Sequence, residues 1–550
     1  MAENLDPNTI YLEWSGSSFP NSYNATFKAP AGSTIDWGDG TVETFDTDSP
    51  QVNKHTYNDG VDNHLIRISG VTSIGNSAFS GCSSLTSVEI GDSVTSIGNS
   101  AFYNCSSLTS VVIGNGVTSI GSYAFYNCSS LTSVVIPASV TLIDYEAFRS
   151  CDSLTNIEVR ADNTAYQSID GNLYTKDGTT LIQYTIGKTA TSFTIPDSVT
   201  SIDEYAFSGC SSLTSVVIPD SVTSIGSRTF YRCSSLTNVV IGNGVTSIGM
   251  YVFDDCDSLT SIEVSADNAT YQSIDGNLYS KNGKTLIRYA IGKMETSFTI
   301  PNGVTLIGTS AFDGCNSLTS VVIPNGVTSI GMYAFDGCSS LTSIVIPDSV
   351  TFIGRQAFWG CSSLTSVVIP NSVTSIGGQA FDGCSSLTFN EYENCKYLGN
   401  EENPYHALIK AKTQNDSAYI IHENTKIIAD EAFEYRRSLT SVVIPDSVTS
   451  IGDRAFSHCD SLTSIMVFPA TPPTLYSSSL SSTIQSIYVQ KSSTEAYKRA
   501  SIWRSFADKI VGNTTYLSFV RFNQANKKYI DSKVAALESR IAKLESKLNG

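Results

Sequence analysis

Few residues of this 550-residue chain have types and spacings that suit catalysis. The histidines show no His-Glu-x-x-His spacing, and neither a Gly-x-Ser-x-Gly elbow nor a Gly-Lys-Ser/Thr phosphate loop is present. Gly114-Asn115-Gly116 lacks the third glycine of a dinucleotide loop and is interpreted as a turn. Asp36, Asp39 and Asp46 could suggest calcium, but acids in turns are the more common explanation. The sequence therefore predicts no catalytic residues, no metal site and no cofactor.

Cysteine recurs at one position of a repeated unit. The chain has 13 cysteines. Twelve share that position: Cys82, Cys105, Cys128, Cys151, Cys210, Cys233, Cys256, Cys315, Cys338, Cys361, Cys384 and Cys459. Neighbouring Cα atoms would lie roughly 5 Å apart, which a disulfide tolerates, but pairing would break the equal spacing of the units. We expect a buried ladder of free thiols, with disulfides and metal ligation as the alternatives.

Tyrosine, tryptophan and arginine gather at variable positions of the same unit. Such side chains anchor interfaces and stack on sugars, so they are the predicted binding residues. They are Tyr103, Tyr123, Tyr126, Tyr231, Tyr251, Tyr333, Trp359, Arg228, Arg232 and Arg355, with Tyr145 and Tyr205 at similar positions. Ordinary turn residues without a function are the alternative. A second variable row, which includes Val112 and Val135 but also Glu89, is expected to point outward from a strand.

The unit that carries these residues repeats every 23 residues. Its phenylalanines give thirteen copies: Phe79, Phe102, Phe125, Phe148, Phe207, Phe230, Phe253, Phe312, Phe335, Phe358, Phe381, Phe433 and Phe456. A period of this length predicts a solenoid, in which stacked units share one apolar core. The Val-Val-Ile segment predicts a short strand, stacked in parallel with its neighbours, and Ala-Phe-x-x-Cys predicts one helical or 3₁₀ turn.

The unit "VTSIG-x-x-AF-x-x-C-S-S-L-T-S-V-V-I-P" resembles the BspA-like class of leucine-rich repeat over residues 71–465. The resemblance implies a leucine-rich-repeat solenoid that functions in adhesion and binding on bacterial or protozoan surfaces, and not in catalysis. Insertions near residues 158–195, 263–300 and 389–427 interrupt the period. The first two carry Lys-Asp-Gly or Lys-Asn-Gly between apolar runs, which predicts hairpins that project from one side of the solenoid.

Two further segments flank the repeats. Residues 1–70 contain Trp-Gly-Asp-Gly-Thr and His-Thr-Tyr, which resemble the polycystic-kidney-disease type of β-sandwich in a small form. We expect this domain to cover the apolar end of the first repeat. Residues 466–511 break the period with prolines and resemble the C-terminal cap common after such repeats.

Residues 512–550 are expected to form a linker and a coiled-coil helix. The apolar seam is Ile530, Val534, Leu537, Ile541, Leu544 and Leu548, and Arg540 and Glu545 flank it. Every e position is acidic and every g position is basic, so parallel association pairs opposite charges. Ile or Val at a with Leu at d favours a dimer, whereas Arg540-Ile541-x-x-Leu544-Glu545 resembles a short trimerisation motif, and we favour a parallel homotrimer.

The net charge and the first residues of the chain disfavour some classes of partner and location. With 33 basic and 51 acidic residues the net charge is −18, which disfavours nucleic acid and anionic membranes, and no apolar run predicts membrane insertion. The first residues show no secretory signal. We therefore expect a non-enzymatic phage head or tail fibre, on the particle surface among other virion proteins, that binds a host-surface protein or glycan. The alternative is an exported bacterial surface adhesin whose signal was removed. A glycan-degrading enzyme would need a carboxylate pair in a cleft, and the scattered acids are interpreted as a solvated face.

Overall fold

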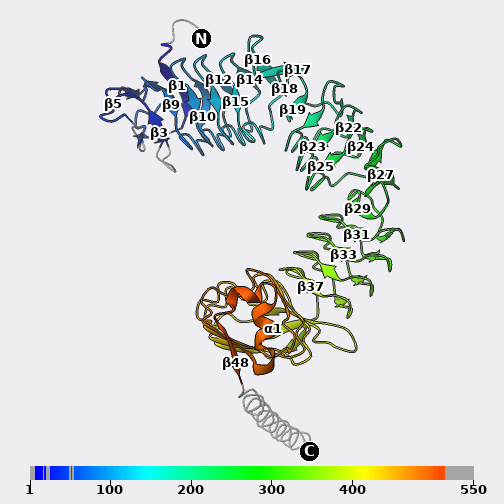
Figure 1. The fold of residues 1–550 in the computed structure, drawn as a ribbon. Coiled ribbons are helices and arrows are strands. Elements are labelled where there is room, and N and C mark those ends of the chain that lie inside the picture. The colour runs from blue at the N-terminus through cyan, green and yellow to red at the C-terminus, as the bar shows by residue number, and fades with distance from the viewer. Residues whose placement is uncertain (1–5, 17, 20–24, 49–50, 53–54, 514–550) are drawn as a thin grey trace, which may run out of the picture. The chain divides into compact units, whose positions relative to one another are not determined.

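The computed structural model describes residues 6–16, 18–19, 25–48, 51–52 and 55–513. Among them the chain forms a β-solenoid of many turns, in two compact units (Figure 1). The first unit comprises residues 1–296 and 306–318, and the second comprises residues 297–305 and 319–550. The predicted coiled-coil residues, from Ile530 to Leu548, lie outside the described residues.

The Val-Val-Ile segments form parallel strands, as their β-branched sequence predicts. In the first unit these strands are β10 (Leu85–Glu89), β12 (Ser110–Val112), β14 (Ser133–Ile136) and β16 (Asn156–Val159), then β20 (Ser192–Thr194), β22 (Ser215–Ile218), β24 (Asn238–Ile241) and β26 (Ser261–Val264). Their register is constant, since Val88 pairs with Val111 and Val111 with Val134. Equivalent side chains therefore lie above one another from turn to turn.

A second row of strands was not predicted. The Ser-Ile pair of each unit, or its Leu-Ile variant, forms a two-residue strand parallel to its neighbours. In the first unit these are β9 (Ser73–Ile74), β11 (Ser96–Ile97), β13 (Ser119–Ile120), β15 (Leu142–Ile143), β21 (Ser201–Ile202), β23 (Ser224–Ile225), β25 (Ser247–Ile248) and β31 (Leu306–Ile307). Each turn of the solenoid thus has two strands with the apolar core between them.

The Ala-Phe-x-x-Cys segment is not the predicted helical or 3₁₀ turn. Its alternate N–H groups donate to the next unit: Ser77 N to Asn99 O at 2.8 Å and Phe79 N to Ala101 O at 2.7 Å. Ser77 has φ of 55°, in the left-handed region. Left-handed residues recur four positions apart, at Ser77 and Gly81, and the N–H groups of Ser77, Phe79 and Gly81 all donate to the next turn, whereas a helix would satisfy them within itself. The segment is not helical because its backbone N–H groups form hydrogen bonds with the next turn.

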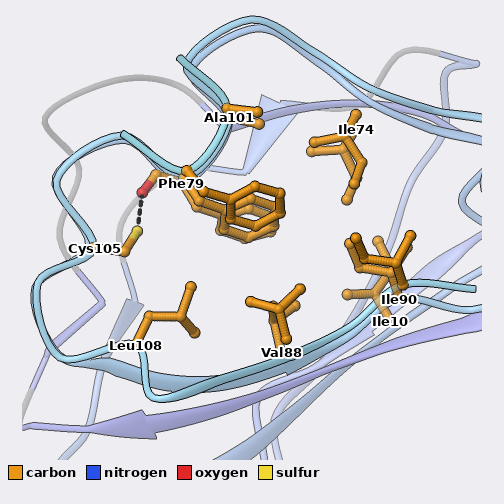
Figure 2. Close-up of a cluster of buried hydrophobic side chains, with 14 of the residues drawn as sticks. Ile10, Ile74, Phe79, Val88, Ile90, Ala101, Cys105 and Leu108 are labelled. Carbon is orange, nitrogen blue, oxygen red and sulfur yellow. Dashed lines mark hydrogen bonds between the residues drawn. The ribbon is translucent and has the colours of Figure 1, made fainter. Parts of the chain in front are cut away.

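The phenylalanine and the cysteine of each turn build the core (Figure 2). The rings of Phe79 and Phe102 stack with centroids 5.1 Å apart. Cys105 Sγ donates to Phe79 O, one turn back, at 3.1 Å. The same bond recurs from Cys128, Cys151, Cys233, Cys256, Cys361, Cys384 and Cys459. All thirteen cysteines are buried and free, so the predicted thiol ladder is confirmed.

The insertions contain the predicted hairpins, but these do not project as appendages. The strands are β17 (Tyr166–Ile169), β18 (Asn172–Thr175) and β19 (Thr180–Gln183) in the first, β27 (Tyr271–Ile274), β28 (Asn277–Ser280) and β29 (Thr285–Arg288) in the second, and β38 (Asn390–Tyr392), β39 (Cys395–Leu398) and β40 (Ala407–Ala411) in the third. Strand β19 pairs in parallel with β21, and Tyr184 stacks on Phe207 at 5.1 Å. The first insertion therefore continues the sheet and the ring stack.

The N-terminal strands pair directly with the first repeat. They are β1 (Thr9–Ser15), β2 (Ser18–Phe19), β3 (Ala25–Lys28), β4 (Thr34–Asp36), β5 (Val42–Thr44), β6 (Gln51–Val52), β7 (His55–Thr56) and β8 (Asn63–Ser69). Strand β1 is antiparallel to β10, and β3 is antiparallel to β9. Ile10 of β1 lies beside Ile90 in the core (Figure 2). In the segment with the predicted sandwich motif, Trp37 stacks on His55 at 4.5 Å; the resemblance to a polycystic-kidney-disease domain stays a prediction.

The second unit repeats the two-strand pattern. One row is β30 (Ser297–Thr299), β32 (Ser320–Val322), β34 (Ser343–Val345), β36 (Ser366–Val368), β41 (Ala418–Ile420), β43 (Ser441–Ile444), β45 (Ser464–Val467), β47 (Ser486–Gln490) and β48 (Ile510–Asn513). The other is β33 (Ser329–Ile330), β35 (Phe352–Ile353), β37 (Ser375–Ile376), β42 (Ile427–Ile428), β44 (Ser450–Ile451) and β46 (Thr474–Leu475). The pattern thus continues into residues 466–511, where the sequence period is lost.

The only helices of the described residues lie near the end of this second unit. They are η1 (Lys491–Ser493), α1 (Thr494–Arg499) and η2 (Trp503–Phe506). Tyr497 OH donates to Pro469 O at 2.8 Å, and Trp503 Nε1 donates to Pro473 O at 2.7 Å. The two buried rings thus satisfy carbonyl groups of the proline-rich segment. None of these helices has the length and apolar character needed to cross a membrane.

Candidate binding ridge

The predicted binding residues of the first unit lie in the turn segments, close to the Ala-Phe step. Tyr123 and Tyr205 directly precede that step, Tyr251 precedes its variant Val252-Phe253, and the three have φ of 58°, 57° and 60°. The left-handed conformation costs an ordinary residue about 1 kcal/mol, which the hydrogen bonds between turns offset. Because consecutive turns are in register, equivalent side chains of neighbouring units meet.

Aromatic rings form a continuous row along the first turns. Tyr103 and Tyr126 stack with centroids 5.0 Å apart and an interplanar angle of 7°. Tyr123 meets Tyr126 edge-on at 5.8 Å and Tyr145 at 5.6 Å. Tyr145 in turn meets Tyr205 at 5.8 Å, although the first insertion separates them in sequence. The row therefore continues past the insertion.

Arg149 sits at the centre of this row and was not among the predicted residues. Its guanidinium carbon lies 4.1 Å from the Tyr205 centroid, 5.7 Å from Tyr126 and 5.6 Å from Tyr231. It forms an ion pair with Glu146, whose side chain is only 2% exposed. The sequence signal was an acid and a base three residues apart across the Ala-Phe step.

Arg228 and Arg232 extend the row toward the second insertion. Arg228 Nη1 donates to Tyr205 OH at 2.7 Å, and its guanidinium lies 4.9 Å from the Tyr251 centroid. Arg232 lies 5.1 Å from the Tyr231 centroid and pairs with Asp255 at 3.3 Å. We call this set the tyrosine–arginine ridge: Tyr103, Tyr123, Tyr126, Tyr145, Arg149, Tyr205, Arg228, Tyr231, Arg232 and Tyr251.

The predicted residues of the second unit are arranged differently. Arg355 forms an ion pair with Glu431, and Gln379 Nε2 donates to the same carboxylate at 3.2 Å. The Glu431 side chain is only 8% exposed. Trp359 is 43% exposed. In this unit Arg355, whose side chain is 38% exposed, is therefore held by a buried carboxylate, and Trp359 has no such ion pair.

Comparison with known proteins identifies the repeat. The family model of the BspA type leucine-rich repeat region, six copies long, matches residues 53–175, 186–291, 289–403 and 412–522. The chain belongs to the BspA-type leucine-rich repeat family. No curated protein matches it.

Several solved structures are similar to this BspA-type chain. A leucine-rich cell surface protein from Faecalibacterium prausnitzii is 33% identical, over 72% of this chain and 83% of that one, with a TM-score of 0.41. A leucine-rich repeat protein from Eubacterium ventriosum is 28% identical, over 59% and 82%, with a TM-score of 0.40. The pneumococcal vaccine antigen PcpA is 18% identical, over 81% and 84%, with a TM-score of 0.31.

Exposure divides the ridge of this BspA-type protein into two kinds of residue. Tyr205 is only 7% exposed, whereas Tyr145 is 39% exposed and the Arg232 side chain 67%. Burial raises the pKa of Tyr123 and Tyr231, and the nearby carboxylates of Glu146 and Asp255 raise it further. These phenols stay protonated at neutral pH and can donate hydrogen bonds. The buried members fix the ridge, and the exposed members can reach a ligand.

The remaining candidate groups are the repeat cysteines, the acids of the N-terminal segment and the outward valines. Burial raises the pKa of Cys82 to about 12, so its thiol stays protonated. Asp36 and Asp39 accept backbone N–H groups two residues on, at 2.9 Å, as turn acids do. The predicted outward valines are confirmed, since Val112 is 52% exposed and Val345 75%. Within the described ranges no group of acids, histidines and cysteines could hold a metal ion.

Proposed function

We propose that the chain is a non-enzymatic adhesion protein that binds a surface protein or glycan through the tyrosine–arginine ridge. The observation that carries the proposal is Arg149, held among three tyrosine rings and paired with a buried glutamate. Rigid aromatic and guanidinium groups lose little entropy on binding and are the usual anchors of interfaces. Membership of the BspA-type family supports the same assignment.

The test alters only exposed ridge residues. We expect Tyr145→Ala with Arg232→Ala to weaken binding of the purified chain to whole target cells at least about tenfold, because each anchor is worth on the order of 1–2 kcal/mol. Met294→Ala is the matched control, since Met294 is 84% exposed and lies outside the ridge. Equal binding by the ridge variant and the control would remove the ridge from the proposal.

We further propose that the chain works as a parallel trimer on a phage fibre. Support comes from the heptad pattern, in which Lys533 and Arg540 at g would face Glu538 and Glu545 at e of a neighbouring chain. These residues lie outside the described part of the chain. The alternative is that the chain is an exported adhesin on a bacterial surface. The BspA-type repeats fit either a phage fibre or a bacterial surface.

Two measurements distinguish the trimeric phage fibre from the bacterial surface adhesin. The solution mass of the full chain should be three times that of one chain and should fall to the monomer value after truncation at Gly512. If both forms are monomers, the trimer proposal fails. Detection of the chain by mass spectrometry in purified phage particles supports the fibre, whereas its recovery only from the surface fraction of bacterial cells supports the adhesin.

A further inference from the structure

The first two insertions are near copies of each other and allow a comparison residue by residue. They read "ADNTAYQSIDGNLYTKDGTTLIQYTIGK" and "ADNATYQSIDGNLYSKNGKTLIRYAIGK". Tyr184 N donates to Ala206 O and Tyr289 N to Ala311 O, both at 2.8 Å. Strand β29 pairs with β31 as β19 pairs with β21. The same backbone therefore carries two different sets of side chains.

A hollow of about 310 Å³ lies beside the second insertion, between β25 and β31 and next to β29. Its lining is mostly apolar and includes Met250, Tyr251, Ile287, Leu306 and Ser310. Met250 is 58% exposed and Leu306 37%. The hollow is therefore open to solvent past two large apolar side chains.

At the first insertion the equivalent space is filled by tyrosine. Ser310 corresponds to Tyr205, because each directly precedes the first Ala-Phe step after its insertion, and their φ values are 53° and 57°. Met250 corresponds to Tyr145, three residues before the phenylalanine. Tyr205 is 7% exposed and meets the Tyr145 ring at 5.8 Å. A phenol ring thus occupies at the first insertion the position that Ser310 leaves open at the second.

Both regions also place a guanidinium at this point. At the first insertion Arg149 lies 4.1 Å from the Tyr205 centroid. At the second, Arg288 lines the hollow and is held by Asp254 Oδ1 at 2.7 Å and by Ser310 O at 2.6 Å. Because Asp254 already offsets the charge of Arg288, the hollow does not favour an anion. A neutral aromatic ring beside the guanidinium would still gain cation–π attraction.

We propose that this hollow is a binding site for a small neutral phenolic or similar single-ring aromatic ligand. An apolar cavity of about 150 Å³ is enough for a benzene ring, so the volume suffices for a substituted ring. Ser310 and Arg288 line the hollow but are only 3% and 5% exposed. The wall therefore combines an apolar surface with a fixed, largely buried cation.

The test uses 4-fluorophenol as the probe and the full chain as the protein. We expect saturable one-site binding by ¹⁹F NMR. Ser310→Tyr should weaken it at least about tenfold, because it restores the side chain that fills the first region. Cyclohexanol, of similar size without an aromatic face, should compete about threefold less well than phenol. Binding that is unchanged in Ser310→Tyr would overturn the proposal.

Two further variants keep the test decisive. Met250→Tyr copies the exposed rim residue of the first insertion and should also weaken binding, without any change at a buried position. Tyr205→Ser should create a second hollow and raise the stoichiometry from one probe to two. If 4-fluorophenol fails to bind the wild-type chain at all, or if Tyr205→Ser gains no site, the equivalence of the two regions is wrong. None of these outcomes depends on the tyrosine–arginine ridge being an adhesion surface.

Discussion

Regular turns and insertion junctions hold neighbouring units together in different ways. In a regular turn, an uncharged thiol donates to the preceding phenylalanine carbonyl, as Cys105 does to Phe79, and the rings stack at about 5 Å. We call the place where an insertion meets the regular turns a junction. An arginine–carboxylate pair lies at or near each junction. The three pairs are Glu146–Arg149, Asp254–Arg288 and Glu431–Arg355.

This difference follows from the geometry of stacking. Similar turns bury similar surfaces, so most backbone polar groups meet an equivalent partner one turn on and no buried charge is needed; the ion pair of a regular turn, such as Arg232–Asp255, is exposed. An insertion displaces one turn and leaves carbonyls and space without their regular partners. Arginine can fill such space because its five donors reach several carbonyls at once, as Arg288 reaches Ser310 O and Phe253 O. The junctions are therefore the charged and irregular parts of an otherwise uniform core.

The largest effect is expected at the second junction. Arg288→Gln introduces the residue that the first insertion has at this position, Gln183, but leaves Asp254 buried without its partner. Breaking a buried pair from one side costs about 3–5 kcal/mol. Native-state hydrogen exchange should therefore show faster opening of the turns around Phe253 and Phe312, which is the suitable measurement because long repeat arrays do not unfold in two states.

A second variant tests whether loss of the Arg288–Asp254 ion pair causes the faster opening. Arg288→Gln combined with Asp254→Asn removes both charges and should recover part of the lost protection. If Arg288→Gln opens no faster than wild type, the buried ion pair does not stabilise the junction. The proposed difference between junctions and regular turns would then be wrong.

A smaller effect is expected inside a regular turn. Cys105→Ala removes one of the two donors to the Phe79 carbonyl, which still accepts from Cys82 N at 3.2 Å, and removes one sulfur from a packed core. The loss should cost about 1–2 kcal/mol, most of it from packing. Cys82→Ala is the matched control: Cys82 begins the stack and its Sγ has no hydrogen bond among the described residues. The difference between the two local opening free energies measures the thiol bond; equal costs would leave the thiol only a space-filling role.

Much of the regular turn was predictable from the sequence. The period places phenylalanine, cysteine and the inward valines at fixed intervals, and burial follows because only stacked units can hide them. The Ser-Ile strands were missed because two residues show no alternation. The Ala-Phe-x-x-Cys turn was misjudged because its apolar spacing also fits one helical turn, and only the hydrogen bonds to the next unit select the left-handed residues.

The junctions were not predictable in the same way. Arg288 pairs with a residue 34 positions away and Arg355 with one 76 positions away, across insertions that have no counterpart in the period. Tyr205 and Arg228 were identified correctly as variable positions, but variability does not distinguish an exposed anchor from a buried contact. That distinction depends on which side chains the insertion brings opposite each other.

The smallest change in stability is expected at the third junction. The test there is specific because the charge of one carboxyl group, Asp430, depends on pH. Burial raises the pKa of Asp430 to about 6, and the nearby Asp453 and Glu431 carboxylates contribute to the shift. The unfolded value is about 3.9. Between these values the folded chain binds a proton that the unfolded chain does not, so this group makes the protein less stable as pH rises from about 4 to 6.

Asp430→Asn removes that titration while leaving an oxygen to accept the Asp453 N–H, which Asp430 Oδ1 now accepts at 2.7 Å. We expect the variant to match wild type near pH 4 and to exceed it by about 1 kcal/mol above pH 6.5, a value reduced for partial exposure to solvent. Hydrogen exchange around Phe433 at both pH values is the measurement. Cys361→Ala, in a regular turn whose thiol does not titrate in this range, should change stability by the same amount at both pH values. If both variants show the same pH profile, the junction carries no more electrostatic strain than a regular turn.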